Sequence, residues 1–291
     1  MRPTSIEAMC KGLQGFETEE GVRRGLEYQP GPTELFISPY AKCGTTWMQQ
    51  IVHGLRTGGA MAFSEITEVV PWLELAHDMG TDVNAPQVVG PRAFKSHLNW
   101  EDIPKGGKYI VVLRDPLDAF ISFYRFFEGW HFEAGSISLS EFADFYLDRP
   151  NGKSYWGHAA SWWRVRDRDD VILFTFENMK TDLAGTVDAV ADFMSPSPND
   201  KARKIATEQA GFAFMKENGR QFDDHLLRAA RDPACGLPPG GIASKVNAGK
   251  VGGEKALITP EIRDKFSERW RKTMTAEFGL NTYSEIISAL K

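Results

Sequence analysis

The chain has 291 residues, with 34 Lys and Arg against 39 Asp and Glu, which gives a formal net charge of −5. This balance argues against a nucleic-acid partner, because neutralising a phosphate backbone needs a surplus of cations across the binding surface. Hydrophobic residues make up 42% of the chain, which excludes a disordered protein and predicts a sizeable core.

The three cysteines, Cys10, Cys43 and Cys235, have no CxxC spacing, so neither a disulfide framework nor a zinc site is indicated. The first ten residues hold no apolar run of the kind that forms a signal peptide. The most apolar stretches, such as residues 109–113, have the length of a strand rather than of a membrane span. We therefore predict a cytoplasmic protein with no membrane partner.

Segments with the pattern of buried strands alternate with segments that have helical spacing over the first two thirds of the chain. The predicted strands cover residues 34–38, 108–113 and 171–176, and the predicted helices cover 47–55, 117–129 and the stretch from 177 to 194. This alternation predicts an α/β fold in a single domain, with a central parallel sheet flanked by helices.

The last third of the chain has helical patterns at 199–216 and 260–278 on either side of a segment rich in glycine. Residues 236–253 include six glycines and two prolines, too many for a helix or a central strand. We predict a mobile loop at about 231–255. The predicted organisation is an N-terminal segment, residues 1–29, followed by one domain at 30–291.

A short polar loop, Lys42-Cys43-Gly44-Thr45-Thr46, lies where the first strand ends and a helix begins. Several backbone N–H groups and the positive end of the helix dipole point outward at such a position. The loop is not a Walker A sequence, because Lys42 precedes Gly44 instead of following a second glycine. On these residues alone, an anion-binding loop and an ordinary capped helix are both open.

Two further pairs of residues carry candidate chemistry. Arg114 ends the second strand and Ser122 follows eight residues later, an arrangement suited to a terminal phosphate, with a salt bridge from Arg114 to Asp115 or Asp118 as the alternative. Lys95 and His97 point to the same face if the backbone is extended there. A histidine is well suited to take a proton from a hydroxyl group near neutral pH, although most histidines are structural or exposed.

These segments resemble motifs of the cytosolic sulfotransferases. PYAKCGTTW resembles their 5′-phosphosulfate loop, YPKSGTTW; LRDPLDAFISFY resembles their 3′-phosphate motif, RNPxDxxxSxY; and FKSHL resembles their KTHLP segment. The resemblance implies a P-loop-like nucleotide-binding fold. It also implies transfer of a sulfuryl group from 3′-phosphoadenosine-5′-phosphosulfate (PAPS) to a hydroxyl or amine of a small acceptor, leaving adenosine 3′,5′-bisphosphate (PAP), with no metal.

The resemblance also assigns roles to residues. It implies that His97 is the catalytic base, that Lys42 stabilises the leaving phosphate and that Lys95 steadies the transferring group. The implied PAPS-binding residues are Lys42, Cys43, Gly44, Thr45, Thr46, Trp47, Arg114, Ser122, Phe176, Phe212, Asn247, Ala248 and Gly249. Asn247 and Ala248 stand where the family has an Arg-Lys pair, so these two positions depart from its C-terminal motif.

The acceptor and the oligomeric state are less defined by the sequence. We expect the acceptor site beside His97. Candidate aromatic residues for it, which can equally belong to the core, are Phe120, Phe123, Tyr124, Trp130 and Phe132. The segment from Lys255 to Asp264 resembles the family's dimer segment, which implies a homodimer. Two alternatives to a sulfotransferase are a P-loop-type nucleotide kinase, which needs a Walker lysine, and a non-catalytic nucleotide-binding module.

Overall fold

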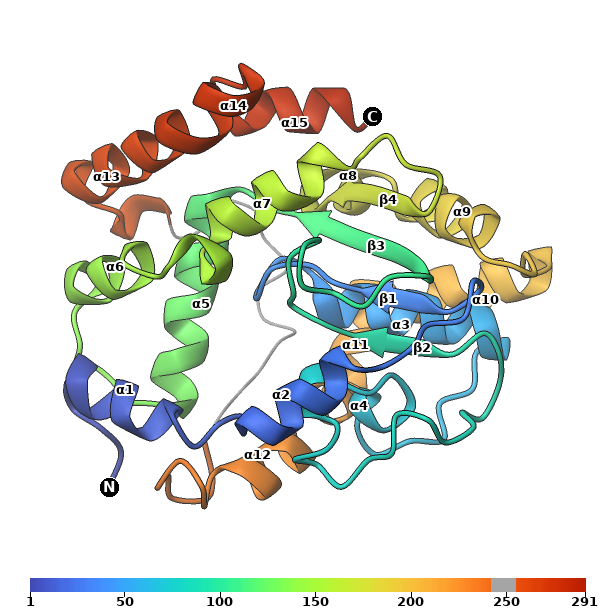
Figure 1. The fold of residues 1–291 in the computed structure, drawn as a ribbon, viewed down its shortest axis with the longest axis horizontal. Coiled ribbons are helices and arrows are strands. Elements are labelled where there is room, and N and C mark those ends of the chain that lie inside the picture. Colours follow the sequence, from blue (N-terminus) through green and yellow to red (C-terminus); the bar gives the residue numbers. More distant parts are fainter. Residues whose placement is uncertain (242–254) are drawn as a thin grey trace.

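The fold is built around one four-stranded parallel sheet, described by a computed structural model that covers residues 1–241 and 255–291 (Figure 1). The strands lie in the order β2-β1-β3-β4. Their bounds are β1 (Leu35–Ile37), β2 (Ala93–Lys95), β3 (Lys108–Leu113) and β4 (Val171–Thr175). The predicted α/β class, with a parallel sheet flanked by helices, is confirmed.

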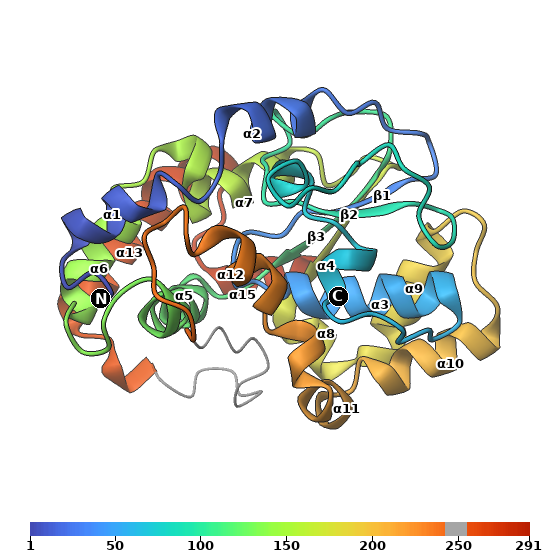
Figure 2. The same ribbon diagram turned by 90° about the horizontal axis from the view of Figure 1, so that it is seen from below.

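Successive strand residues pack into two different cores, one on each face of the sheet. On β3, Tyr109 and Val111 belong to one core, whereas Ile110 and Val112 belong to the other. The first core is completed by α5 (Pro116–Trp130), α7 (Tyr155–Arg164) and α13 (Pro260–Trp270), and the second by α3 (Thr45–Thr57), α9 (Leu183–Phe193) and α10 (Asp200–Gln209). Figure 2 shows the second group together below the sheet. Burial on both faces explains why β3 is a continuous apolar run.

Several helices were not predicted from the sequence, and α2 shows why. Its buried residues are Gly21 and Gly25, whereas its two apolar side chains, Val22 and Leu26, are half-buried and exposed, so the helix has no buried apolar face. A Cβ atom at Gly25 would lie 2.6 Å from the carbonyl oxygen of Leu73, so the absence of a side chain permits this close approach. Some of the other helices, such as α8, α11 and α14, overlap stretches predicted to be helical. The bounds of the helices not yet described are α1 (Ile6–Leu13), α2 (Glu19–Leu26), α4 (Ile66–Val69), α6 (Leu139–Leu147), α8 (Phe176–Thr181), α11 (Phe212–Glu217), α12 (His225–Arg231), α14 (Ala276–Phe278) and α15 (Tyr283–Ala289).

The predicted loop at 231–255 begins within packed structure. Arg231 ends α12, is buried, and donates hydrogen bonds to the carbonyl oxygens of Gly15 and Phe16 at 2.7 and 2.9 Å. Residues 242–254 lie outside the described part of the chain. After them, Thr259 caps α13 and Ile262 packs into the core, so part of the predicted dimer segment has a structural role within the subunit.

The arrangement of the strands determines where the site lies. Because all four strands are parallel, their carboxyl ends meet at one edge of the sheet, where ligands bind in folds of this class. The loop with Lys42 follows β1, His97 follows β2, Arg114 follows β3 and Phe176 follows β4. Over the two described ranges, no helix is both long and apolar enough to cross a membrane.

Candidate active site

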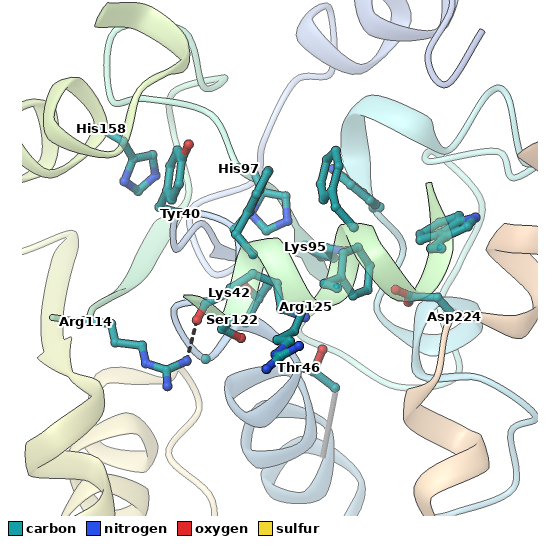
Figure 3. A pocket seen from close by; sticks show the side chains of 18 of the residues that line it. Tyr40, Lys42, Thr46, Lys95, His97, Arg114, Ser122, Arg125, His158 and Asp224 are labelled. Atoms are coloured by element: carbon teal, nitrogen blue, oxygen red, sulfur yellow. Dashed lines mark hydrogen bonds between the residues drawn. The ribbon is translucent and has the colours of Figure 1, made fainter. Parts of the chain in front are cut away.

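A cavity of about 1480 Å³ opens at the carboxyl edge of the sheet (Figure 3). Most of the predicted site residues line it: Lys42, Gly44, Thr45, Thr46, Trp47, Lys95, His97, Arg114, Ser122, Phe176 and Phe212. The fold thus brings together residues from all four strand ends and from α11. Cys43 does not line the cavity, and Asn247, Ala248 and Gly249 lie outside the described residues.

The loop before α3 has the geometry of an anion-binding site. Lys42 and Gly44 both have left-handed backbone conformations, with φ of 67° and 103°. Gly44 is the N-cap of α3 and no side chain caps this helix, so its first amides point outward with no intrahelical acceptor. In the described part of the chain, the buried hydroxyl of Thr45 has no hydrogen-bond partner. A bound phosphate would satisfy these donors.

Cys43 differs from its neighbours in the loop. Its side chain is fully buried in the core that also contains Tyr40, and its backbone N–H donates to the carbonyl oxygen of Tyr40 at 3.1 Å. The Cys43 amide is therefore engaged within the loop, and the implied role of Cys43 in binding PAPS stays a prediction. Burial raises the pKa of the Cys43 thiol to about 12, so the side chain is neutral near pH 7.

Arg114 joins the loop to the third strand. Its Nη1 donates to the carbonyl oxygen of Lys42 at 2.9 Å, the contact marked in Figure 3. Its guanidinium lies 4.4 Å from the centre of the Phe176 ring, and its buried Nε has no partner among the described residues. Asp115 accepts hydrogen bonds from the first amides of α5. The guanidinium and Ser122 line the same cavity, as a phosphate site requires.

Aromatic side chains flank the loop on its other side. The rings of Trp47 and Phe176 meet edge to face at 5.4 Å, and the indole N–H of Trp47 donates to the carbonyl oxygen of Ala210 at 2.8 Å. Phe212, at the start of α11, is 46% exposed and lines the cavity. Together these rings form apolar surfaces of the kind on which a nucleotide base can stack.

The His97 side chain has a defined hydrogen-bonding state. Its Nδ1 lies 2.6 Å from the carbonyl oxygen of Pro39. Because a carbonyl oxygen only accepts, Nδ1 carries the proton of the neutral ring and Nε2 carries the lone pair. The strand β2 ends at Lys95, so an extended-strand relationship does not place Lys95 and His97 together, but both side chains line the cavity. This tautomer is the one that a general base needs.

Two of the lysines that line the cavity, Lys42 and Lys95, rest on aromatic rings. The ammonium nitrogen of Lys95 lies 3.5 Å from the centre of the Trp72 ring, and that of Lys42 lies 3.9 Å from the centre of the Phe126 ring. Lys95 is only 3% exposed. Contact with the negative face of an aromatic ring stabilises a cation that has lost much of its water.

Aromatic side chains form one wall of the cavity, whose lining also includes charged residues such as Arg125, Glu128 and Asp224. Of the aromatic candidates from the sequence, Phe123 and Trp130 line the cavity, whereas Phe120, Tyr124 and Phe132 do not and are buried in the core. Sequence reasoning missed Phe16, Trp72, Phe126, Phe127 and His131. The ring of Phe16 lies 5.8 to 6.0 Å from those of Trp72, Trp130 and His131. Burial lowers the pKa of His131 to about 3, so this wall carries no charge near pH 7.

One group of candidate metal ligands, Glu65, Asp223 and His225, occurs in the described ranges, and none of its members lines the cavity. Nδ1 of His225 lies 2.8 Å from Asp223, and its Nε2 lies 2.9 Å from the hydroxyl of Ser64. Glu65 accepts the N–H of Leu226 at 2.6 Å. These contacts tie the start of α12 to the segment before α4, which is a structural role.

Comparisons with known proteins agree with this geometry. A family model described as "Sulfotransferase domain" matches residues 32–278. Human sulfotransferase 1C2 is 24% identical over 262 residues, covering 85% of each chain, and sulfotransferase 2A6 of Rattus norvegicus is 29% identical over 195 residues, covering 64% of this chain and 67% of its own. The fold resembles a crystal structure of mouse sulfotransferase SULT7A1 complexed with PAP, with a TM-score of 0.67 and 21% identity over 94% and 93% of the chains. The chain therefore belongs to the sulfotransferase family, as its motifs predict.

Proposed function

We propose that this protein transfers a sulfuryl group from PAPS to a hydroxyl or amine of an apolar, flat acceptor, with His97 as the base. As a member of its family, the chain is a PAPS-dependent sulfotransferase. The observation that carries the proposal is the state of His97, whose Nδ1 is bound to a backbone carbonyl oxygen. Its Nε2 is the proton acceptor in the same cavity as the uncapped start of α3.

The donor fits the polar side of the cavity. The amides of Gly44, Thr45 and Thr46 would hold the 5′-phosphosulfate, supported by the buried hydroxyl of Thr45. Arg114 and Ser122 would hold the 3′-phosphate. The buried Nε of Arg114 has no hydrogen-bond partner among the described residues, so it offers a donor for this group. Trp47, Phe176 and Phe212 would surround the adenine. Contributions from Asn247, Ala248 and Gly249 stay predictions, as does a homodimer through the segment from Lys255 to Asp264.

The chemistry asks this chain for a base and for positive charge. When bound, PAPS supplies the sulfuryl group. Nε2 of His97 takes the proton from the acceptor as its oxygen or nitrogen forms the new bond to sulfur. Lys42 neutralises the negative charge that develops on the leaving phosphate oxygen, and Lys95 stabilises the charge on the transferring group. Because donor and acceptor share one cavity, much of the barrier is lowered by holding them in line.

The acceptor faces the uncharged aromatic wall. Phe16, Trp72, Phe126, Trp130 and His131 are all aromatic, and His131 is neutral near pH 7 because burial lowers its pKa to about 3. Apolar, flat molecules bind such surfaces through burial of area and ring contacts. A phenol or an alcohol on an apolar scaffold is the acceptor class that fits this wall.

The proposal is tested by mixing the protein with PAPS and a panel of phenols, alcohols and amines, then measuring PAP and sulfated product by mass spectrometry. We expect His97→Ala to keep PAP affinity and to lose turnover by roughly 10²-fold to 10⁴-fold, the usual contribution of general base catalysis. His77→Ala is the matched control, because His77 is exposed and does not line the cavity. PAP binding without product from any acceptor would favour a non-catalytic module, and full turnover in His97→Ala would remove His97 from its role.

A further inference from the structure

A short segment that precedes β2 in sequence by about twenty residues runs beside it in space. The N–H of Lys95 donates to the carbonyl oxygen of Pro71 at 2.8 Å, and Trp72 forms a parallel bridge with Lys95. The chain then makes one 3₁₀ turn, Leu73–Leu75. The turn therefore lies next to the residues that follow β2, which include His97.

Glu74, in the middle of this turn, contacts the backbone of His97 directly. Its Oε1 accepts the backbone N–H of His97 at 2.9 Å, and the residue is only 6% exposed. The preceding amide, that of Ser96, still donates to Ile37 of the neighbouring strand at 2.9 Å. His97 is thus the first residue after β2 whose backbone N–H has no acceptor in the neighbouring strand, and Glu74 supplies the hydrogen-bond acceptor for it.

Contacts from three residues help to hold His97 in place. Glu74 binds its backbone N–H, the Pro39 carbonyl oxygen binds its Nδ1, and the Trp72 ring meets its ring edge to face with centres 5.0 Å apart. Of these, the Glu74 contact is made by a side chain that is not itself part of the aromatic wall, so a substitution there can remove it.

We propose that Glu74 is a positioning residue for the reaction: its carboxyl oxygen holds the His97 backbone so that Nε2 faces the acceptor. The proposal rests on the role of His97 as base. A displacement of about 1 Å in a reacting group is enough to cost roughly 10²-fold in rate.

The contact needs an acceptor oxygen, and it does not need a negative charge. Burial raises the pKa of Glu74, which favours the neutral acid, and a neutral carboxyl group still accepts through its carbonyl oxygen. Glutamine has the same length and an amide oxygen in the same place. Leucine has no acceptor and would leave the His97 N–H without its partner, which costs free energy in a buried site.

The test compares Glu74→Leu, Glu74→Gln and the control Glu208→Leu, which makes the same change at an exposed position on α10 outside the cavity. PAP affinity and acceptor KM are measured beside kcat. We expect Glu74→Leu to lower kcat by roughly 10²-fold, with PAP affinity and acceptor KM close to wild type. Glu74→Gln is expected to recover roughly tenfold or more of that loss, and Glu208→Leu to resemble wild type.

Three results would overturn the proposal. They are wild-type kcat in Glu74→Leu, a kcat in Glu74→Gln as low as in Glu74→Leu, and a loss of PAP affinity in parallel with kcat. If Glu74→Leu does not unfold cooperatively or bind PAP, Glu74→Met, which conserves length, is measured against the same outcomes. His97→Ala separates the two claims: its full turnover would refute the base, whereas an inactive His97→Ala beside a normal Glu74→Leu would refute only the positioning role.

Discussion

The two sides of the cavity are built in opposite ways. The donor side, which we define as Lys42, Gly44, Thr45, Thr46, Arg114 and Ser122, comes from loops and helices that follow strands. It presents amides, hydroxyls and positive charge. The acceptor side, defined as Phe16, Trp72, Phe126, Trp130 and His131, is aromatic and uncharged, and it includes a residue from the N-terminal segment. His97 and Lys95 belong to neither set and line the same cavity.

The difference shows that backbone geometry serves the binding of PAPS, whereas the packing of side chains serves the binding of the acceptor. On the donor side, backbone geometry at the ends of strands sets the chemistry, so a few short motifs are enough to encode it. On the acceptor side, side chains from segments far apart in sequence meet through tertiary packing. Substitutions on the donor side should therefore change nucleotide affinity with every acceptor, whereas substitutions on the acceptor side should change which acceptor is used.

Among the substitutions that compare the two sides, Arg114→Met is expected to give the largest effect. It removes a charge-assisted contact to the 3′-phosphate and the hydrogen bond to the Lys42 carbonyl oxygen. Such contacts are each worth about 1.5–3 kcal/mol, so PAP affinity should fall by roughly tenfold to 100-fold, as measured by isothermal titration calorimetry. Arg114→Lys, which keeps the charge but loses the paired geometry, serves as the comparison. Unchanged PAP affinity in Arg114→Met would break the assignment of the donor side.

Phe16→Leu should affect only the acceptor side. The leucine keeps an apolar side chain but loses the ring contacts to Trp72, Trp130 and His131. Such ring contacts are worth about 0.5–1.5 kcal/mol each, so kcat/KM for aromatic acceptors should fall by roughly tenfold, with PAP affinity unchanged. Equal losses for all acceptors together with weaker PAP binding would show that the two sides are not separable.

His131, a residue of the acceptor side, makes the free energy of unfolding depend on pH. Its pKa is about 3 in the folded protein and about 6.5 when exposed, so the unfolded chain binds the proton more tightly. Its contribution to the free energy of unfolding is full above pH 6.5 and declines as the pH falls toward 3. Between pH 7.5 and 5 the loss should be about 2 kcal/mol.

His131→Phe should remove this part of the pH dependence, measured by urea unfolding at both pH values. His53 and His158 have pKa values lowered by burial in the same direction, so the variant should keep a smaller decline. An identical pH dependence in the variant and the wild type would contradict the neutral, buried state of His131.

Cys43→Ser should have the smallest effect. The side chain faces the core and the Cys43 amide bonds to Tyr40, so PAP affinity should stay within roughly twofold even though the serine restores the family motif. The pKa of the thiol is about 12, so the wild-type cysteine should resist iodoacetamide at pH 8. A tenfold gain in PAP affinity would place this side chain in the phosphate site instead.

The sequence identified residues of the donor side that line one cavity because most of them closely follow a strand with a clear apolar pattern, whereas their roles in binding stay predictions. The strand at 108–113 and the helix after it illustrate this: β3 is buried on both faces, and Pro116 begins α5. The acceptor side was mostly not predictable, since no linear pattern connects Phe16 with Trp130, and Phe120 and Phe132 have the same local pattern as residues that do line the cavity. The helix α2 escaped prediction because its buried residues are glycines.

The most direct test of the central claim is a crystal structure of the protein with PAP bound. We predict the 5′-phosphate at the amides of Gly44, Thr45 and Thr46, the 3′-phosphate at Arg114 and Ser122, and Nε2 of His97 facing the space beside the aromatic wall. A PAP molecule with its 5′-phosphate away from the start of α3, or a His97 ring turned so that Nε2 contacts the protein instead of the cavity, would contradict the division of the cavity into a donor side and an acceptor side.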